Sequence, residues 1–115
     1  MKTNFEMQYQ NITMVRGDTL AFNVVPLDSD GNVVSVSSAY FSCKKNRAMS
    51  SYEFQKSLGD GIIQDAGGLM VRVAPEDTAD IDAGRYYYDL QLGVDDDIYT
   101  VLIGSLSIEQ DVTTN

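Results

Sequence analysis

The sequence lacks histidine and contains a single cysteine among its 115 residues. Without histidine the chain cannot assemble Ser/His/Asp or Cys/His nucleophilic machinery or a histidine-bearing zinc site. Oxygen-ligand Ca²⁺ or Mg²⁺ sites and paired-carboxylate chemistry remain open. The lone cysteine, Cys43, cannot form an internal disulfide, so we expect a fold that is stable in a reducing compartment.

Long apolar runs and positive charge are also scarce. No stretch approaches the ~18 apolar residues of a membrane span, and residues 1–8 lack the apolar region of a signal peptide. Eight Lys and Arg residues against 17 Asp and Glu residues give a formal net charge of −9. Because this charge opposes the counterion release that drives nucleic-acid binding, we expect no nucleic-acid partner. We also expect a soluble protein with no membrane contact and no secretion through a signal peptide.

The patterning that is present is typical of β-structure. Apolar and polar residues alternate in short segments, and turn signals recur about every 8 to 12 residues without a helical period. Pro75 to Ile81 is the exception, because proline at a first-turn position followed by acids predicts one helical turn. A chain of this length buries roughly two-thirds of its unfolded surface. The sequence therefore predicts one all-β domain over residues 1–115.

The stretch from Asp82 to Leu92 predicts the central strand. It begins with a turn signal and continues with aromatic and aliphatic side chains at alternate positions. The order Asp82, Gly84, Tyr86 is typical of the tyrosine corner of immunoglobulin-like sandwiches, in which a tyrosine bonds back to the backbone two residues before a cysteine. Tyr88 stands at that cysteine position. We predict an immunoglobulin-like β-sandwich of seven to nine mostly antiparallel strands without a disulfide.

Two strands break their alternation. From Glu6 to Val15 the apolar parity changes near Asn11, so we predict a bend or β-bulge there. From Ile98 to Ile108 it changes near Gly104, so we predict a β-bulge or a strand that switches sheets there. Twelve residues are predicted to form the core: Leu20, Phe22, Val24, Phe41, Cys43, Leu69, Val71, Tyr86, Tyr88, Leu90, Val101 and Ile103.

Several short motifs have both a functional and a structural interpretation. Arg16, Gly17 and Asp18 form the tripeptide that integrins bind, but Gly-Asp is also ordinary turn chemistry between strands. The run from Asp28 to Asn32 begins like an EF-hand loop, yet lacks its glycine and glutamate, so a hairpin turn is favoured.

Acidic residues and tyrosines provide the remaining candidates. The turn formed by Asp95, Asp96 and Asp97 could help to bind a hard cation, although a solvated acidic turn is the simpler interpretation. Tyr87 and Tyr40 are predicted to lie on the outer face of one sheet and to mark a protein or glycan contact.

Catalysis is not expected. Cys43 is interpreted as a small buried hydrophobic residue. Acidic pairs such as Glu76 with Asp77 lie on a short exposed crossover, a setting that does not favour general acid–base catalysis. We therefore predict a protein that is not an enzyme and that needs no cofactor or metal.

The order of these motifs resembles the N-terminal immunoglobulin-like domain of phage baseplate upper proteins and related phage and prophage tail proteins. The segments that carry the resemblance span most of the chain: Arg16–Val24, Asp28–Val33, Ala39–Lys45, Asp82–Leu90 and Gly104–Thr113. The resemblance implies a β-sandwich that assembles with copies of itself or with neighbouring tail proteins, and it transfers no catalytic residues.

From this resemblance we expect a structural or interaction module of a phage or prophage particle, located in a virion or in the bacterial cytoplasm. Exposed strand edges and two flexible terminal arms, residues 1–10 and 110–115, would make its contacts. The competing hypothesis is an adhesion or carbohydrate-binding module that uses loop tips and exposed tyrosines. A third hypothesis, a carboxylate enzyme, requires two acids close together in a cleft.

Overall fold

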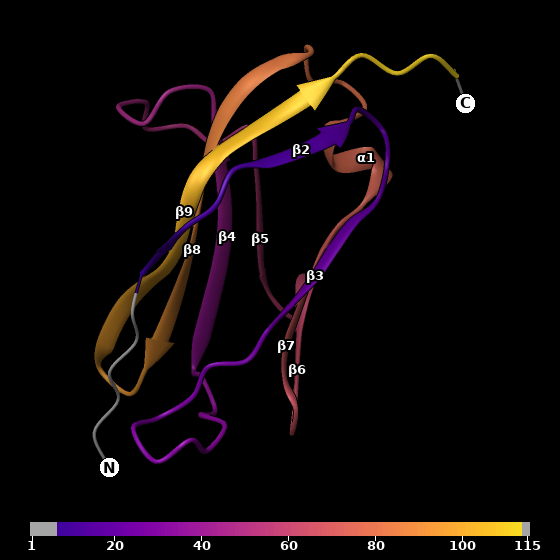
Figure 1. Cartoon of the computed structure of the whole chain (residues 1–115). Helices are drawn as coiled ribbons and strands as arrows, with labels where there is room; N and C mark the ends of the chain where they lie inside the picture. Colours follow the sequence, from indigo (N-terminus) through magenta and orange to yellow (C-terminus); the bar gives the residue numbers. More distant parts are fainter. Residues whose placement is uncertain (1–6, 114–115) are drawn as a thin grey trace.

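A computed structural model describes residues 7–113. These residues form nine strands and one short helix (Figure 1). In chain order the elements are β1 Gln8–Tyr9, β2 Ile12–Val15, β3 Leu20–Val24, β4 Ser38–Lys44, β5 Phe54–Leu58, β6 Gly61–Asp65, β7 Gly68–Val73, α1 Pro75–Thr78, β8 Gly84–Val94 and β9 Asp97–Glu109. The predictions of a mostly β fold, one short helical turn and no disulfide are confirmed.

All nine strands belong to one hydrogen-bonded sheet, with the order β1-β9-β8-β4-β5-β6-β7-β3 and with β2 also on β9. The sheet curls into a half-barrel, so two layers face each other across the core. A β-sandwich of the predicted type has two separate sheets. The layers are joined because β5 and β6 make a two-residue parallel contact, at Ser57 with Gly61 and at Leu58 with Ile62.

The longest pairings lie at the centre of the sheet. β8 pairs antiparallel with both β4 and β9, and the register places Phe41 opposite Leu90 and Cys43 opposite Tyr88. Alternation along β4 and β8 sends these four side chains to the concave side. The stretch predicted to be the central strand therefore occupies the centre of its layer.

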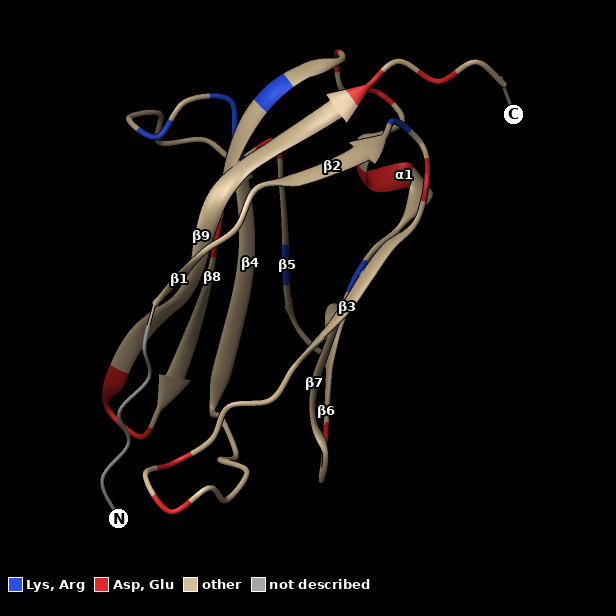
Figure 2. Ribbon diagram, viewed as in Figure 1, with Lys and Arg blue, Asp and Glu red and all other residues tan. Residues whose placement is uncertain are grey.

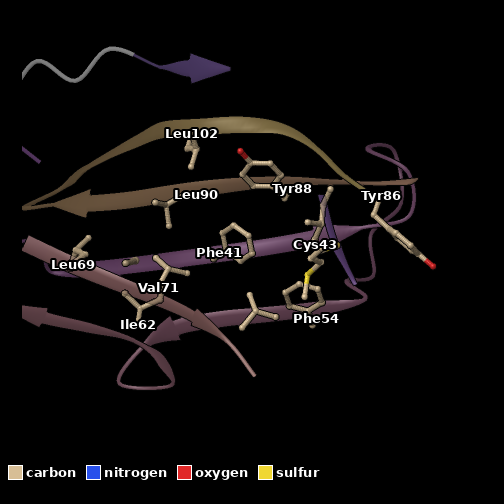
Figure 3. Packing of buried hydrophobic residues seen from close by; sticks show 14 of the residues in the cluster. Phe41, Cys43, Phe54, Ile62, Leu69, Val71, Tyr86, Tyr88, Leu90 and Leu102 are labelled. Carbon is tan, nitrogen blue, oxygen red and sulfur yellow. The ribbon is translucent and has the colours of Figure 1, made fainter. Parts of the chain in front are cut away.

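Phe41 lies at the middle of the core (Figure 3). Its ring centroid is 5.6 Å from that of Phe22, 6.1 Å from Phe54 and 5.3 Å from Tyr88, so one side chain links β3, β4, β5 and β8. Of the predicted core residues, seven are buried: Phe41, Cys43, Leu69, Val71, Tyr86, Tyr88 and Leu90. Four others pack against the core while partly exposed: Leu20, Phe22, Val24 and Val101.

The β-bulge in β9 lies earlier than predicted. The pairing with β8 shifts between Leu90 and Gln91, which face Leu102 and Thr100, so Val101 is the extra residue. As a consequence Leu102 is buried in the core, and Ile103, predicted to be a core residue, lies on the opposite face. The predictions of a bulge near Gly104 and of a core position for Ile103 were therefore wrong.

Gly104 instead permits a close approach of the N-terminal segment. A β-carbon at Gly104 would lie 2.0 Å from the carbonyl oxygen of Gln10. The same carbonyl accepts a hydrogen bond from the Tyr88 hydroxyl at 2.7 Å, and the Asn11 Oδ1 atom accepts two from Ser105. These contacts fix the break between β1 and β2, where a bend was predicted.

The predicted terminal arms fall partly outside the described residues. Residues 1–6 and 114–115 are not described, whereas Gln8 and Tyr9 pair parallel with β9 at Leu102 and Ile103. The described end of the expected N-terminal arm is therefore part of the sheet.

The helical turn α1 is held to neighbouring strands. The Asp77 carboxylate accepts a hydrogen bond from the Ala74 amide at 2.7 Å and forms an ion pair with Lys56 of β5 at 3.1 Å. The buried hydroxyl oxygen of Thr78 accepts a hydrogen bond from the Gly17 amide at 2.8 Å. Asp77, one of the two acids of this turn, thus has structural partners.

Tyr86 makes the hydrogen bond expected of a tyrosine corner. Its hydroxyl donates to the carbonyl oxygen of Asp82 at 2.5 Å, and Gly84 begins β8 between them. The side chain is buried at one end of the core. The bond therefore fixes the entry of the chain into its central strand.

We predict that Tyr86→Phe lowers the free energy of unfolding by about 1 kcal/mol, because the part-buried hydrogen bond to the Asp82 carbonyl is lost. Urea denaturation of both proteins measures the difference. Tyr9→Phe is the matched control, since Tyr9 is 74% exposed. An unchanged midpoint for Tyr86→Phe would show that the hydrogen bond contributes nothing to the fold.

Candidate functional site

Exposed tyrosines and cations gather on the convex side of β4 and β8. We call this surface the tyrosine face and define it by Tyr40, Tyr52, Tyr87, Lys44, Arg47 and Asp89. All six residues line one hollow of ≈ 500 Å³. The prediction that Tyr40 and Tyr87 share the outer face of one sheet agrees with this arrangement.

The strand register produces the surface. Lys44 lies opposite Tyr87, and Tyr40 lies opposite Gln91. Because residues two apart on a strand face the same side, Tyr40 and Lys44 project away from the core that contains Phe41. From the next strand, the Gln55 amide donates a hydrogen bond to the Ser42 hydroxyl at 3.0 Å.

Two tyrosine rings of this face each lie against a positively charged side chain. The Arg47 guanidinium carbon lies 5.1 Å from the centroid of the Tyr87 ring, and the Lys44 Nζ atom lies 5.1 Å from that of Tyr52. Cation–π contacts at these distances are attractive and hold the long side chains against the rings. The connection from β4 to β5 is thereby packed onto the face.

Positive charge is concentrated here although the chain is acidic overall. Lys44, Lys45 and Arg47 lie at the β4 end and its connection, and Arg85 lies on the adjacent part of β8 (Figure 2). The one acid of the face, Asp89, has its pKa raised by desolvation, and Lys44 partly offsets this shift. A partly desolvated carboxyl beside tyrosines and cations is suited to contact with a polar ligand.

The other predicted surface residues lie elsewhere. The Arg16 guanidinium forms an ion pair with Asp111 at 2.9 Å and donates to the Ile81 carbonyl, and the Asp18 amide donates to the Val15 carbonyl in a turn. These bonds hold the Arg-Gly-Asp segment against the C-terminal end of β9. Its arginine is therefore not presented as a projecting loop tip.

The acidic turn lies at the far end of the β8–β9 hairpin (Figure 2). Asp95 and Asp96 connect Val94 to its partner Asp97, and Asp95 has a φ of 55°, a left-handed conformation that aspartate tolerates. Eight residues of strand separate Tyr87 from Asp95, which corresponds to roughly 26 Å. The seven predicted surface residues therefore do not form one site.

The segment from Asp28 to Asn32 is a hairpin turn, as the sequence favoured. The Asp28 Oδ1 atom accepts hydrogen bonds from the amides of Asp30 and Asn32, and Leu27 bridges to Val33. Within residues 7–113, no group of three or more acids or cysteines is arranged to hold a metal ion. The single helix in the same residues is too short and too polar to cross a membrane.

Cys43 is fully buried beneath the face, and burial raises the pKa of its thiol to about 12, with a further contribution from the charge of Glu53. The thiolate fraction at pH 8 is then about 10⁻⁴, roughly a thousandfold below that of an exposed thiol.

We predict that the rate at which an aromatic disulfide reagent modifies Cys43 in the native protein is limited by the rate of unfolding. A native rate equal to the rate in denaturant would contradict this burial.

Sequence reasoning did not name several residues of the face as site candidates. Lys44 and Asp89 share the parity of Tyr40 and Tyr87, so the alternation could have identified them. Arg47 and Tyr52 lie in an irregular connection. No periodic signal indicates that this connection folds back onto the tyrosines.

No protein-family model matches the chain, and no curated protein sequence matches it significantly.

Proposed function

We propose that this chain is a non-enzymatic interaction module with an immunoglobulin-like fold, and that it binds a partner protein through the tyrosine face. The observation that carries the proposal is the exposure of Tyr40 and Tyr52, at 43% and 50%, beside the Arg47–Tyr87 pair. Tyrosine and arginine are enriched at the centres of protein interfaces and dominate their binding energy. The face combines both types: Tyr40 and Tyr87 lie on paired strands, and Arg47 and Tyr52 lie on the connection between β4 and β5.

The strand order supports the immunoglobulin-like assignment. Taking β1 and β2 as strand A, β3 as B, β4 as C, β5 as C′, β6 as D, β7 as E, β8 as F and β9 as G gives the order A-G-F-C-C′-D-E-B. In variable-type domains C′ extends the layer that contains G, F and C, while B, E and D lie in the other layer. The hydrogen bond from Tyr86 to Asp82 lies at the E–F corner, as in that family.

An aromatic cluster takes the place of the disulfide in this proposal. Antibody domains pack a tryptophan on strand C against a bridge between B and F. Here Phe41 on β4 contacts Phe22 on β3 and Tyr88 on β8. Three rings thus join the same three strands without any requirement for oxidation.

For the partner we propose other structural proteins of a phage or prophage particle, or further copies of the chain. The resemblance of the sequence motifs to tail and baseplate proteins supports this choice. Assembly would take place in the bacterial cytoplasm and the product would reside in the virion. Membrane and nucleic-acid contacts are not part of the proposal.

Light scattering after size exclusion, over a wide concentration range, tests self-assembly. The proposal predicts a closed oligomer, such as a trimer or hexamer, that dissociates in a Tyr87→Ala, Arg47→Ala variant. Loss of these two side chains should weaken the contact by about 2 kcal/mol or more, about thirtyfold. Ile63→Ala is the matched control because Ile63 is 59% exposed on β6, outside the face. An oligomer that is insensitive to the double variant would exclude the face as its interface.

A second candidate function is glycan binding. Tyr40 lies beside the amides of Gln55 and Gln91 in the same hollow, and sugars pack on aromatic rings while bonding to amides and carboxylates. A glycan array distinguishes the two functions. Saturable binding of one sugar class that Tyr40→Ala abolishes would favour the glycan over the protein partner.

A further inference from the structure

A groove that contains no charged side chain lies at the open seam of the half-barrel, between β3 and the edge formed by β1 and β9. Its volume is ≈ 750 Å³. Leu20, Phe22 and Val24 line one side, and Leu92, Val101 and Leu102 line the other. None of the described residues that line the groove is charged, although the chain as a whole carries a formal charge of −9.

One wall of the groove is an unprotected strand edge. Within residues 7–113, β3 pairs with β7 and with no other strand, so its second backbone edge has no partner strand. Figure 1 shows β3 running beside β7 and away from β2. Exposed edges are normally blocked by lysine, proline or inward-pointing charge, and the five residues of β3 include none of these.

The side chains of β3 alternate in the manner that strand addition requires. Leu20, Phe22 and Val24 are half-buried toward the groove, whereas Ala21 is exposed and does not line it. Asn23 is also exposed, and it borders the groove. A strand added to this edge would direct every second side chain into the groove, since successive residues face opposite sides. Val25 and Leu27, 50% and 44% exposed, extend the apolar lining beyond the end of β3.

We propose that the free edge of β3 accepts an extended segment of another protein, uncharged and with an apolar residue at every second position. Such β-augmentation gives affinity through main-chain hydrogen bonds and specificity through alternate side chains. The added strand would fill the seam between β3 and β1. This site is separate from the tyrosine face and does not depend on it.

The groove favours a strand over other occupants. A lipid or small apolar ligand would cover the backbone groups of β3 without pairing them, which is costly. If the β3 strands of two copies paired, the Phe22 side chain of each copy would point into the interior of that copy and would not fill the groove of the other. Two copies would also repel each other, because each carries a formal net charge of −9.

A peptide probe tests the site. We would titrate the full chain with acetyl-KTVTVTVK-amide and follow backbone amide shifts by NMR. We expect saturable shifts confined to β3, Val25 to Leu27, and Val101 and Leu102. At peptide concentrations about ten times the Kd, hydrogen exchange of the β3 edge amides should slow about tenfold. The peptide acetyl-KVVVTTTK-amide has the same composition and charge without the alternation, and it should not bind.

Matched variants on β3 locate the binding. Val24→Lys places a charge in the groove and should weaken binding at least about tenfold. Ala21→Lys adds the same charge at an exposed position of β3 that does not line the groove, and it should leave binding within about twofold. If Val24→Lys does not fold, Val24→Thr should weaken binding in the same direction. The proposal is overturned if the second peptide binds equally, if shifts occur at Tyr40 and Tyr87 instead, or if a Val24 variant that folds binds normally. A concentration-dependent dimer that Val24→Lys abolishes would assign the groove to a second copy and equally overturn it.

Discussion

Replacing Phe41 by alanine is expected to lower the free energy of unfolding by about 3–5 kcal/mol, because it leaves a cavity where four strands meet. Phe41 is fully buried, and its ring contacts those of Phe22, Phe54 and Tyr88. The cluster connects both layers of the half-barrel, which have no disulfide between them. A loss of this size is a large fraction of the total stability of a small domain.

Urea denaturation monitored by tyrosine fluorescence measures the effect, with exposed Ile63→Ala as the control that should change stability by less than about 0.5 kcal/mol. A double-mutant cycle with Phe22→Leu isolates the contact between the layers, for which we expect a coupling of about 0.5–1.5 kcal/mol. A loss below about 1 kcal/mol for Phe41→Ala would show that the cluster does not hold the layers together.

The second large effect is expected for Gly104→Ala. The added methyl group would lie 2.0 Å from the Gln10 carbonyl oxygen and 2.7 Å from its carbon, and backbone atoms cannot yield as a flexible side chain can. The N-terminal segment must move off β9, which also breaks the hydrogen bond from Tyr88. We expect a loss of about 2–3 kcal/mol.

NMR distinguishes this mechanism from general destabilisation. Amide shifts in Gly104→Ala should be largest at Gln10, Asn11 and Ser105, and the Gln10 amide, which donates to the Ile103 carbonyl, should exchange faster. Gly67→Ala is the matched control, because the new methyl group meets only the Asp65 carboxylate at 3.3 Å. Equal losses in the two variants would mean that the contact at Gly104 has no special role.

Both surfaces proposed here could act in one assembly. The tyrosine face lies on the convex side of β4 and β8, whereas the groove lies at the edge beside β3. A module with two different contact surfaces can join two different neighbours. The two sets of variants, at Arg47 and Tyr87 and at Val24, allow each contact to be removed separately.

Local patterns predicted the strands best where alternation is regular. Along β4 and β8 the parity placed Phe41, Cys43 and Tyr88 in the core and Tyr40 and Tyr87 outside, because adjacent residues of a paired strand must face opposite sides. The same rule could not identify Ile62, which is fully buried, since both Ile62 and Ile63 are apolar and only the pairing with Val71 selects between them.

Long-range contacts explain the predictions that were wrong. Gly104 was interpreted as the site of the bulge, but its lack of a side chain serves the crossing of Gln10, which is 94 residues away in the sequence, and the extra residue is Val101. The two layers are joined by the pairing of β5 with β6, which involves only two residues of each strand, beginning with Ser57 and Gly61. A pairing that short leaves no local signal in the sequence. The position of Arg47 over Tyr87 likewise depends on how an irregular connection folds.

Site-specific photo-crosslinking in the organism that encodes this chain tests the central claim most directly. A benzophenone amino acid replaces Tyr40 on the tyrosine face and, in a control protein, Ile63 on β6. We predict that the Tyr40 position cross-links to one defined protein, that the Ile63 position does not, and that Arg47→Ala combined with Tyr87→Ala removes the product. Equal cross-linking from both positions, or a product that is insensitive to the double variant, would contradict the assignment of this face as the binding surface.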